Sequence, residues 1–322
     1  MLQLPGKHIG FVFSDPAGAN ACLALADIWQ QETGTEPLLF SNKELGVKRN
    51  GRFYLSADTP AFKQFKIDCI FTGTSHPVSS KYFEINCIIK ATEEGIYTIA
   101  FIDHWVNFKL RFTGKDGLQH YPDEIWVLDE TARNLAIAEG LPVEKLFIHE
   151  NPYHVFLKNN WQPEYEEKAY LKELGIRQDG CHVLFAPDPL SLRNGKEIQG
   201  FTEDEALDDL LAVAGGVKTD LSLIIKMHPL QPLGILEEKV KVVPGLEVFF
   251  IKDANTLELI MACDVVIGFY SNLLLEAATL GKKVIRYFPG KNEADLLKHN
   301  SSLIKVVERQ ELRRELKKAI NE

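Results

Sequence analysis

The feature that most constrains the fold of this chain is a regular alternation of short apolar runs with longer segments of helical periodicity. In the first half, apolar runs begin at residues 8, 37, 68, 97 and 124, and helix-period segments lie at 20–32 and 84–95. Strands that alternate with amphipathic helices are joined by crossover connections, so neighbouring strands run parallel and both faces of the sheet are covered. We therefore expect a parallel α/β sheet in this half.

The second half repeats the alternation. We expect strands at 181–188, 222–229, 246–252, 264–269 and 282–288, and helices at 204–216, 256–262, 271–281 and 309–321. A stretch rich in aromatic, proline and polar residues separates the halves around Trp161. Because a single core stops growing at roughly 250–300 residues, a chain of 322 residues favours two domains. The predicted fold is α/β, with two Rossmann-like doubly wound domains, 1–160 and 161–322, facing each other across a cleft.

Bulk composition excludes several classes of partner. The chain has 36 Lys and Arg against 45 Asp and Glu, a net charge of −9, which repels nucleic acid. No run approaches the roughly 18 apolar residues of a membrane span, so we expect no integral membrane contact, and the first residues lack the pattern of a secretory signal. Five scattered cysteines fit reduced core thiols of a cytoplasmic protein better than disulfides or a metal site.

Polar residues follow the predicted strands at the points where an open parallel sheet binds ligands. In the second domain, Lys226 and His228 end one strand, and Pro229 fixes the backbone just beyond them so that the imidazole can donate to a phosphate oxygen. Ser271 begins a helix, where its hydroxyl and the free N–H groups of the first turn can bind an anion. The alternative is structural: His228 as a hydrogen-bonded strand end, and Ser271 as an ordinary N-cap.

Glu276 lies five residues after Ser271 on the same predicted helix. Its carboxylate can accept hydrogen bonds from ribose hydroxyls, or it can be a buried carboxylate bonded to a neighbouring N–H.

In the first domain, a loop of small residues follows the first strand and opens a helix. It contains Ser14, Asp15, Gly18 and Asn20. The glycine spacing is not that of a dinucleotide-binding fingerprint. The loop still allows backbone N–H groups to approach a bound group, and Asp15 is placed to take a proton from a hydroxyl. Alternatively, Asp15 is an N-cap with Pro16 at the first helical position.

Two further strand ends complete the candidate site of the first domain. Thr72, Thr74 and Ser75 offer hydroxyls to an acceptor or a phosphate, although a turn needs no function. Asp103 and His104 close an apolar strand, and a histidine beside a carboxylate is a candidate general base. The same residues can equally form a hydrogen-bonded corner. Asn107, Lys109 and Arg111 follow and can bind an anionic acceptor.

The second domain resembles the C-terminal half of GT-B-fold glycosyltransferases. The resemblance rests on Lys-Met-His-Pro at 226–229, on Tyr-Ser at 270–271, and on Leu-Glu-Ala-Ala-Thr-Leu-Gly-Lys-Lys-Val-Ile at 275–285. It is nearest to CDP-glycerol glycerophosphotransferases, bacterial sialyltransferase-like and capsule polysaccharide enzymes, and more distantly to UDP-N-acetylglucosamine 2-epimerases. It implies that His228 and Ser271 hold the phosphates of a nucleotide donor and that Glu276 holds its ribose.

The chain departs from these families at two positions. Asn272 stands where many have a second Ser or Thr, and Asp188 lies where many have an Arg or Lys. Arg193, Asn194 or Lys196 are candidates to replace that missing donor.

Three functions follow from the resemblance and the residues. The first is transfer of a glycosyl or polyol-phosphate group from a nucleotide-activated donor to a hydroxyl acceptor, a sugar or lipid-linked glycan, with Asp15, Asp103 or His104 as base. The second is epimerisation or hydrolysis of the nucleotide sugar itself, and the third is a non-catalytic binding protein on the same scaffold. We expect no cofactor and no metal, since no ligand spacing is present.

Overall fold

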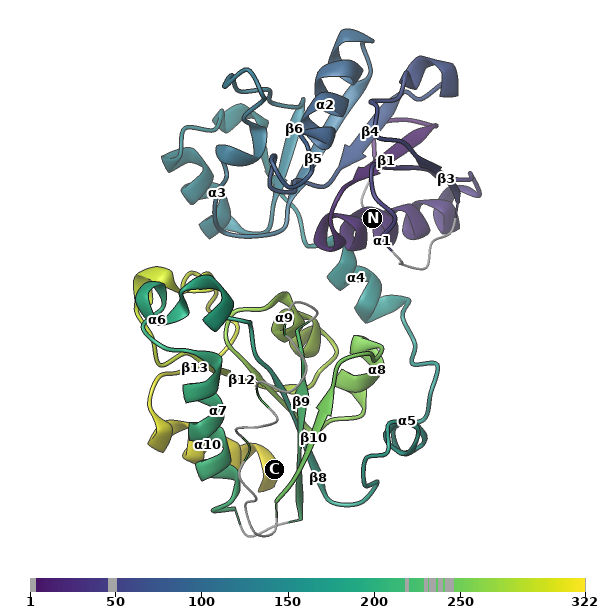
Figure 1. The fold of residues 1–322 in the computed structure, drawn as a ribbon. Coiled ribbons are helices and arrows are strands. Elements are labelled where there is room, and N and C mark those ends of the chain that lie inside the picture. Colours follow the sequence, from purple (N-terminus) through teal and green to yellow (C-terminus); the bar gives the residue numbers. More distant parts are fainter. Residues whose placement is uncertain are drawn as a thin grey trace. The chain divides into compact units, whose positions relative to one another are not determined.

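The structure is a computed structural model of the chain, shown in Figure 1. It describes residues 4–45, 51–217, 220–228, 231, 236, 240 and 246–321. The chain divides into two compact units, residues 1–160 and 161–322, here called unit 1 and unit 2.

Unit 1 is built around a seven-stranded parallel sheet. Its strands are β1 (Ile9–Phe13), β2 (Leu38–Ser41), β3 (Arg52–Leu55), β4 (Cys69–Thr72), β5 (Tyr97–Ile102), β6 (Glu124–Val127) and β7 (Leu146–Ile148). Its α-helices are α1 (Pro16–Thr33), α2 (Phe83–Glu93), α3 (Glu130–Ala138) and α4 (Pro152–Asn159). The strand order is β3-β2-β1-β4-β5-β6-β7, with every pair parallel.

Both faces of the unit 1 sheet are buried, as the apolar runs require. Along β1, Phe11 and Phe13 belong to the core cluster that contains the apolar side chains of α1, whereas Val12 belongs to the cluster that contains those of α2. Successive strand residues point to opposite faces, so a strand covered by helices on both sides must be apolar throughout. All five residues of β1 are accordingly buried.

Unit 2 contains a six-stranded parallel sheet. Its strands are β8 (Cys181–Ala186), β9 (Leu221–Lys226), β10 (Leu246–Ile251), β11 (Val265–Gly268), β12 (Lys283–Tyr287) and β13 (Lys305–Val306). Its described α-helices are α5 (Glu167–Glu173), α6 (Gly195–Ile198), α7 (Glu203–Ala214), α8 (Thr256–Met261), α9 (Asn272–Thr279) and α10 (Arg309–Asn321). The strand order is β10-β9-β8-β11-β12-β13. Within this unit, α7 and α10 pack together on one face of the sheet, and α8 and α9 cover the other (Figure 1).

The predicted fold class, two α/β units with parallel doubly wound sheets, is confirmed. The strands that the sequence did not reveal are β3, β7 and β13, which lie at sheet edges. Edge strands are covered less, so their residues need not be apolar: both ends of β3 are exposed, and Phe147 and Ile148 of β7 are 42% and 45% exposed. No helix among the described residues is long and apolar enough to cross a membrane.

Candidate functional site

Each sheet has one point at which the strand order reverses, and the candidate residues follow the strands at that point and the strands next to them. In unit 1 the reversal falls between β1 and β4, and in unit 2 between β8 and β11. At such a point the connections leave in opposite directions, which opens a crevice at the carboxyl ends of the strands. The loops after β1 and β4 contain Asp15 and Thr74, and those after β8 and β11 contain Asp188 and Ser271.

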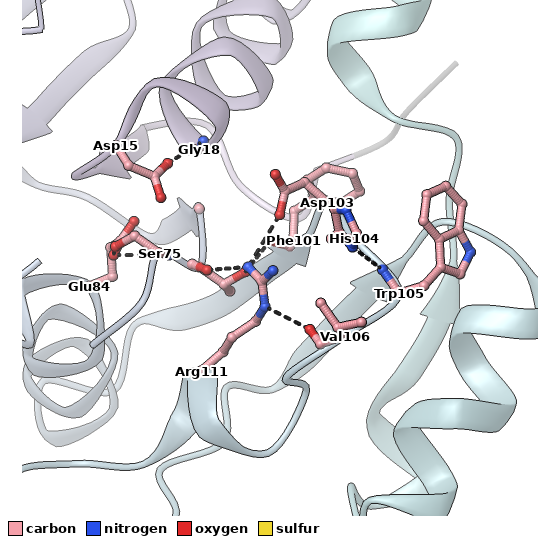
Figure 2. Close-up of polar contacts among 12 residues, drawn as sticks. Asp15, Gly18, Ser75, Glu84, Phe101, Asp103, His104, Trp105, Val106 and Arg111 are labelled. Atoms are coloured by element: carbon pink, nitrogen blue, oxygen red, sulfur yellow. Dashed lines mark hydrogen bonds and ion pairs between the residues drawn. The ribbon is translucent and has the colours of Figure 1, made fainter. Parts of the chain in front are cut away.

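Asp15 is the N-cap of α1, and Pro16 occupies the first helical position. An Asp15 oxygen accepts from the Gly18 amide at 2.7 Å (Figure 2), so the structural alternative raised by the sequence is realised. The side chain is nevertheless partly exposed. Burial is the main cause that raises its pKa, and the nearby charge of Asp103 adds to the effect. Asp15 therefore caps the helix and remains available as an acceptor.

Arg111 connects the ends of β4 and β5, as Figure 2 shows. Its Nη1 donates to the carbonyl and hydroxyl oxygens of Thr74 and to the Asp103 carboxylate, which lies 3.2 Å away. Its Nε donates to the carbonyl of Val106 at 3.4 Å. Arg111 is the middle residue of a short 3₁₀ helix, Leu110–Phe112, and its side chain is 14% exposed. The guanidinium expected to bind an anionic acceptor is thus used to hold the protein's own groups.

Glu84, which sequence reasoning missed, lies on the first turn of α2 and is only 3% exposed. Its Oε2 accepts from the amide of Ser75 at 3.3 Å and from the Ser75 hydroxyl. Its Oε1 has no hydrogen-bond partner among the described residues. Burial, together with the charge of Asp15, raises the pKa of Glu84 to about 7. A further carboxyl group therefore lies close to Asp15.

His104 has a defined tautomer. Its Nδ1 accepts from the amide of Trp105 at 2.9 Å, so the neutral ring carries its proton on Nε2 (Figure 2). Burial lowers its pKa, which favours that neutral form. The Trp105 indole is fixed in turn by Asp129, at 3.0 Å. His104 is consequently arranged to donate a hydrogen bond rather than to accept a proton.

The hydroxyl groups expected to meet an acceptor or phosphate are engaged within unit 1. Ser14 donates to Asn42, Thr72 to the Gly73 carbonyl, Thr74 to the Phe101 carbonyl and Ser75 to Glu84. All four residues are at most 6% exposed. The structure thus places them as internal donors. Asn20 lies on α1 and is partly exposed.

Two glycines bring the first turn of α1 against the end of β4. A Cβ added to Gly73 would lie 2.7 Å from the Cα of Gly18, closer than real Cβ atoms approach. The absence of both side chains is therefore what allows the two backbones to meet. We call this contact the glycine seam. It places Asp15, which precedes α1, beside the residues that follow β4.

In unit 2, His228 follows β9 and is partly buried. Its amide donates to the side chain of Gln231 at 2.9 Å, and Gln231 returns a backbone bond to the His228 carbonyl. Burial and the positive charges of Arg193 and Lys226 lower the pKa of His228. Lys226 donates to the Lys252 carbonyl at 3.4 Å, and burial lowers its pKa. Pro229 lies outside the described residues.

Ser271 caps α9, and its hydroxyl accepts from the Leu273 amide at 3.3 Å. Asn272 is the first helical residue and is partly exposed. Glu276 is partly buried one turn later, and burial alone raises its pKa to about 7. Among the described residues, no N–H donor contributes to the shift of the Glu276 pKa. The Glu276 carboxylate is therefore a candidate to accept a hydrogen bond from a ligand.

Asp188 and Arg193 complete the strand ends of unit 2. Burial raises the pKa of Asp188 to about 6, while the charge of Arg193 and a backbone hydrogen bond from Tyr270 oppose that rise. Its Oδ2 has no partner among the described residues. Of the three candidates for the missing donor, Lys196 pairs with Glu205, whereas Arg193 is exposed and acts on both Asp188 and His228. Arg193 therefore fits the role best.

The described part of the chain contains no group of three or more histidine, cysteine, aspartate or glutamate side chains arranged to hold a metal ion.

Solved structures of other proteins share the fold of this chain. No protein family model and no curated protein sequence matches the chain. Among solved structures, the UDP-GlcNAc 2-epimerase of Neisseria meningitidis bound to UDP-GlcNAc has a TM-score of 0.68 at 13% identity, covering 98% of this chain and 92% of that one. The epimerase of Methanocaldococcus jannaschii has a TM-score of 0.64 at 12% identity, covering 98% and 93%.

Anabaena Alr3699/HepE in complex with UDP has a TM-score of 0.62 at 14% identity, covering 98% of this chain and 90% of that one. At such low identities the likeness establishes the two-domain fold and leaves the chemistry to be argued from the site. The distant resemblance to UDP-N-acetylglucosamine 2-epimerases noted in the sequence is consistent with this likeness of fold.

Proposed function

We propose that this protein binds a nucleotide-activated sugar through the strand ends of unit 2 and transfers the glycosyl group to a hydroxyl acceptor. The observation that carries the proposal is the set of groups after β9 and β11: the imidazole of His228, the first turn of α9 at Ser271, and the carboxylate of Glu276. The fold that holds them is shared with proteins solved with UDP and UDP-GlcNAc.

Each of these groups suits one part of a nucleotide. Phosphate oxygens are acceptors, which His228 and the N–H groups at the start of α9 can satisfy while the helix dipole assists. The exposed guanidinium of Arg193 adds a positive charge within range of His228. Ribose hydroxyls are donors, and Glu276 offers an acceptor in a partly buried setting. Unit 2 therefore provides complementary partners for both the charged and the neutral parts of the donor.

Unit 1 is assigned the proton transfer. The acceptor hydroxyl loses its proton to a carboxylate as its oxygen bonds to the sugar carbon, and the bond from that carbon to the phosphate oxygen breaks, leaving the electron pair on the nucleotide. Asp15 suits this role better than Asp103, because its pKa is raised whereas Asp103 is paired with Arg111 at 3.2 Å. His104, protonated on Nε2, is better suited to hold a substrate oxygen.

A second candidate is epimerisation or hydrolysis of the nucleotide sugar without an acceptor. The observation that favours it is Glu84, because such reactions use additional carboxyl groups around the sugar and unit 1 gathers three. The two candidates differ in what they consume.

Product analysis separates them. The chain is incubated with UDP-, CDP- and GDP-activated sugars, first alone and then with sugar and polyol acceptors, and products are identified by mass spectrometry. Transfer requires the acceptor and yields a glycoside, whereas epimerisation or hydrolysis proceeds with the donor alone. Failure of every nucleotide to bind by calorimetry, together with activity unchanged in His228→Ala, would contradict the proposal as a whole.

A further inference from the structure

We propose that the strand ends of unit 1 bind an uncharged group rich in hydroxyls, and that the carboxyl groups there reject phosphorylated or carboxylated ligands. The inference rests on the proposed function, because it names the chemical class of the group presented to the catalytic side of the reaction. It changes the sequence-based expectation, in which Arg111 and the small-residue loops were to receive an anion.

The charges at these strand ends are predominantly negative. Asp15, Glu84 and Asp103 come from three different loops and helices, and the charge of Asp103 acts on Asp15 while that of Asp15 acts on Glu84. The cations that act on Asp15 are Arg111 and Lys43. Lys43 donates to the Ser79 carbonyl at 2.7 Å. A ligand that brought further negative charge would meet three carboxyl groups and two cations that are already engaged.

Arg111 is committed to the protein through the atoms that a phosphate would use. Its Nη1 serves Thr74 and Asp103, and its Nε serves Val106. Bidentate recognition of a phosphate or carboxylate needs two parallel N–H groups of the guanidinium. To provide them, Arg111 would have to give up either the bonds of Nη1 to Thr74 and Asp103 or the 3.4 Å bond of Nε to Val106, and loss of the first set leaves the Asp103 charge unpaired beside the incoming anion.

The helix N-terminus does not change this conclusion. The start of an α-helix favours anions, but at α1 that position is taken by the Asp15 carboxylate, which accepts from the Gly18 amide at 2.7 Å. The positive end of the α1 dipole is therefore already neutralised by the carboxylate of Asp15.

Glu84 supplies an independent observation. Its residue is 3% exposed, and its Oε1 lacks a hydrogen-bond partner among the described residues. This oxygen faces the glycine seam, 3.3 Å from the point where a Gly73 Cβ would lie and 3.6 Å from the point for Gly18. An Asp15 oxygen lies 3.2 Å from that same Gly18 point, so the two carboxyl oxygens are at most about 7 Å apart.

An acceptor without a donor is costly when buried, and it selects the kind of ligand that can satisfy it. Hydroxyl groups donate, whereas a fully ionised phosphate or carboxylate offers only further acceptors. The partly exposed carboxylates of Asp15 and Asp103 can each accept from a sugar ring, and above its pKa of about 7 the buried Glu84 adds a negative charge behind them. The site is thus complementary to a neutral polyol and mismatched to an anion.

Matched pairs of small molecules test this inference. Glucose, N-acetylglucosamine, galactose and glycerol are each compared with their phosphate esters by ligand-observed saturation-transfer NMR on the full chain at pH 8, without nucleotide. We expect at least one neutral member to bind at least about tenfold more tightly than its phosphate, and Asp15→Asn to weaken that binding by about tenfold.

Glu84→Gln should reduce the ratio between the affinities for the neutral sugar and for its phosphate, because at pH 8 it removes a negative charge while keeping the side-chain shape. Glu93→Gln, which changes an exposed carboxylate at the other end of α2, should leave both affinities unchanged. The inference is overturned if the phosphates bind as tightly as the neutral sugars, or if no neutral sugar binds. Because phosphates can also bind the phosphate site proposed in unit 2, the phosphate series is repeated with His228→Ala, and only the phosphate binding that this variant keeps is assigned to unit 1.

Discussion

The two units share a strand order, apart from the additional edge strand β7 of unit 1, and differ in the cations that lie near the point where that order reverses. Unit 1 gathers Asp15, Glu84 and Asp103 beside one committed arginine, whereas unit 2 gathers Lys226, His228 and the exposed Arg193. Both proposed sites consist of loops and helix starts at the carboxyl ends of parallel strands. The comparison teaches that the same strand ends can carry different sets of charges, and the ligands proposed for the two units differ accordingly.

The largest expected effect comes from the acidic side. The pKa of Glu84 is about 7 in the folded chain and about 4.3 in an unfolded one, so folding favours its protonated form. The resulting stability is fully present below about pH 4.3 and is lost as pH rises through 7. We expect wild type to lose about 3 kcal/mol relative to Glu84→Gln between pH 4.5 and pH 8, measured by urea unfolding.

In the matched variant Glu93→Gln, the free energy of unfolding should change with pH in the same way as in wild type, since that carboxylate is exposed. If the free energy of unfolding of Glu84→Gln also changes with pH as in wild type, Glu84 titrates normally. That result would weaken the contrast between the units.

On the basic side, His228→Ala should weaken nucleotide binding by roughly 30-fold, about 2 kcal/mol, which is the loss of a hydrogen bond to a charged phosphate. Calorimetry with the nucleotide that gives the largest thermal shift measures this. His299→Ala, elsewhere in unit 2, is the control and should bind as wild type. An unchanged affinity in His228→Ala would remove the imidazole from the phosphate site.

The glycine seam offers a test of how unit 1 places its carboxyl groups. Gly73→Ala introduces a Cβ that would lie 2.7 Å from the Cα of Gly18, so the backbones must separate. We expect a loss of about 1.5 kcal/mol in the free energy of unfolding, together with weaker sugar binding. Gly216→Ala, where the nearest atom is 3.5 Å away, should change stability little. Equal effects of the two substitutions would argue against a close backbone contact.

The smallest effect is expected at Glu276. Glu276→Gln keeps one acceptor oxygen, so affinity for a ribonucleotide should fall only about fivefold, or about 1 kcal/mol. The sharper readout is selectivity: wild type should prefer UDP over its 2′,3′-dideoxy analogue, and the variant should lose much of that preference. Glu293→Gln serves as the exposed control. A preference that survives in Glu276→Gln would assign the ribose to another group.

The sequence allowed the fold and part of each site to be predicted. Apolar runs alternating with helix-period segments determine a parallel sheet, because strands buried on both faces must be apolar throughout. His228, Ser271 and Asp15 could be found because each follows such a run. Glu84 could not, since an acidic residue on the first turn of a helix is ordinary, and its importance arises only from burial against the ends of two other strands.

Arg111 and Arg193 show the same limit of what the sequence predicts. Both were noted as possible anion ligands, yet the structure commits Arg111 to Thr74 and Asp103 and leaves Arg193 exposed beside His228. Sequence position alone carries no information about which side chains already have partners, because those partners come from loops that are distant along the chain.

Hydrogen exchange in the presence and absence of UDP tests the central claim most directly. If the nucleotide belongs to unit 2, saturating UDP should slow exchange at the end of β9 and over the first turn of α9, while the segment from Ser14 to Asn20 at the start of α1 keeps its rates. Protection concentrated in that segment of unit 1, with no change around His228 and Ser271, would contradict the assignment of the two sites.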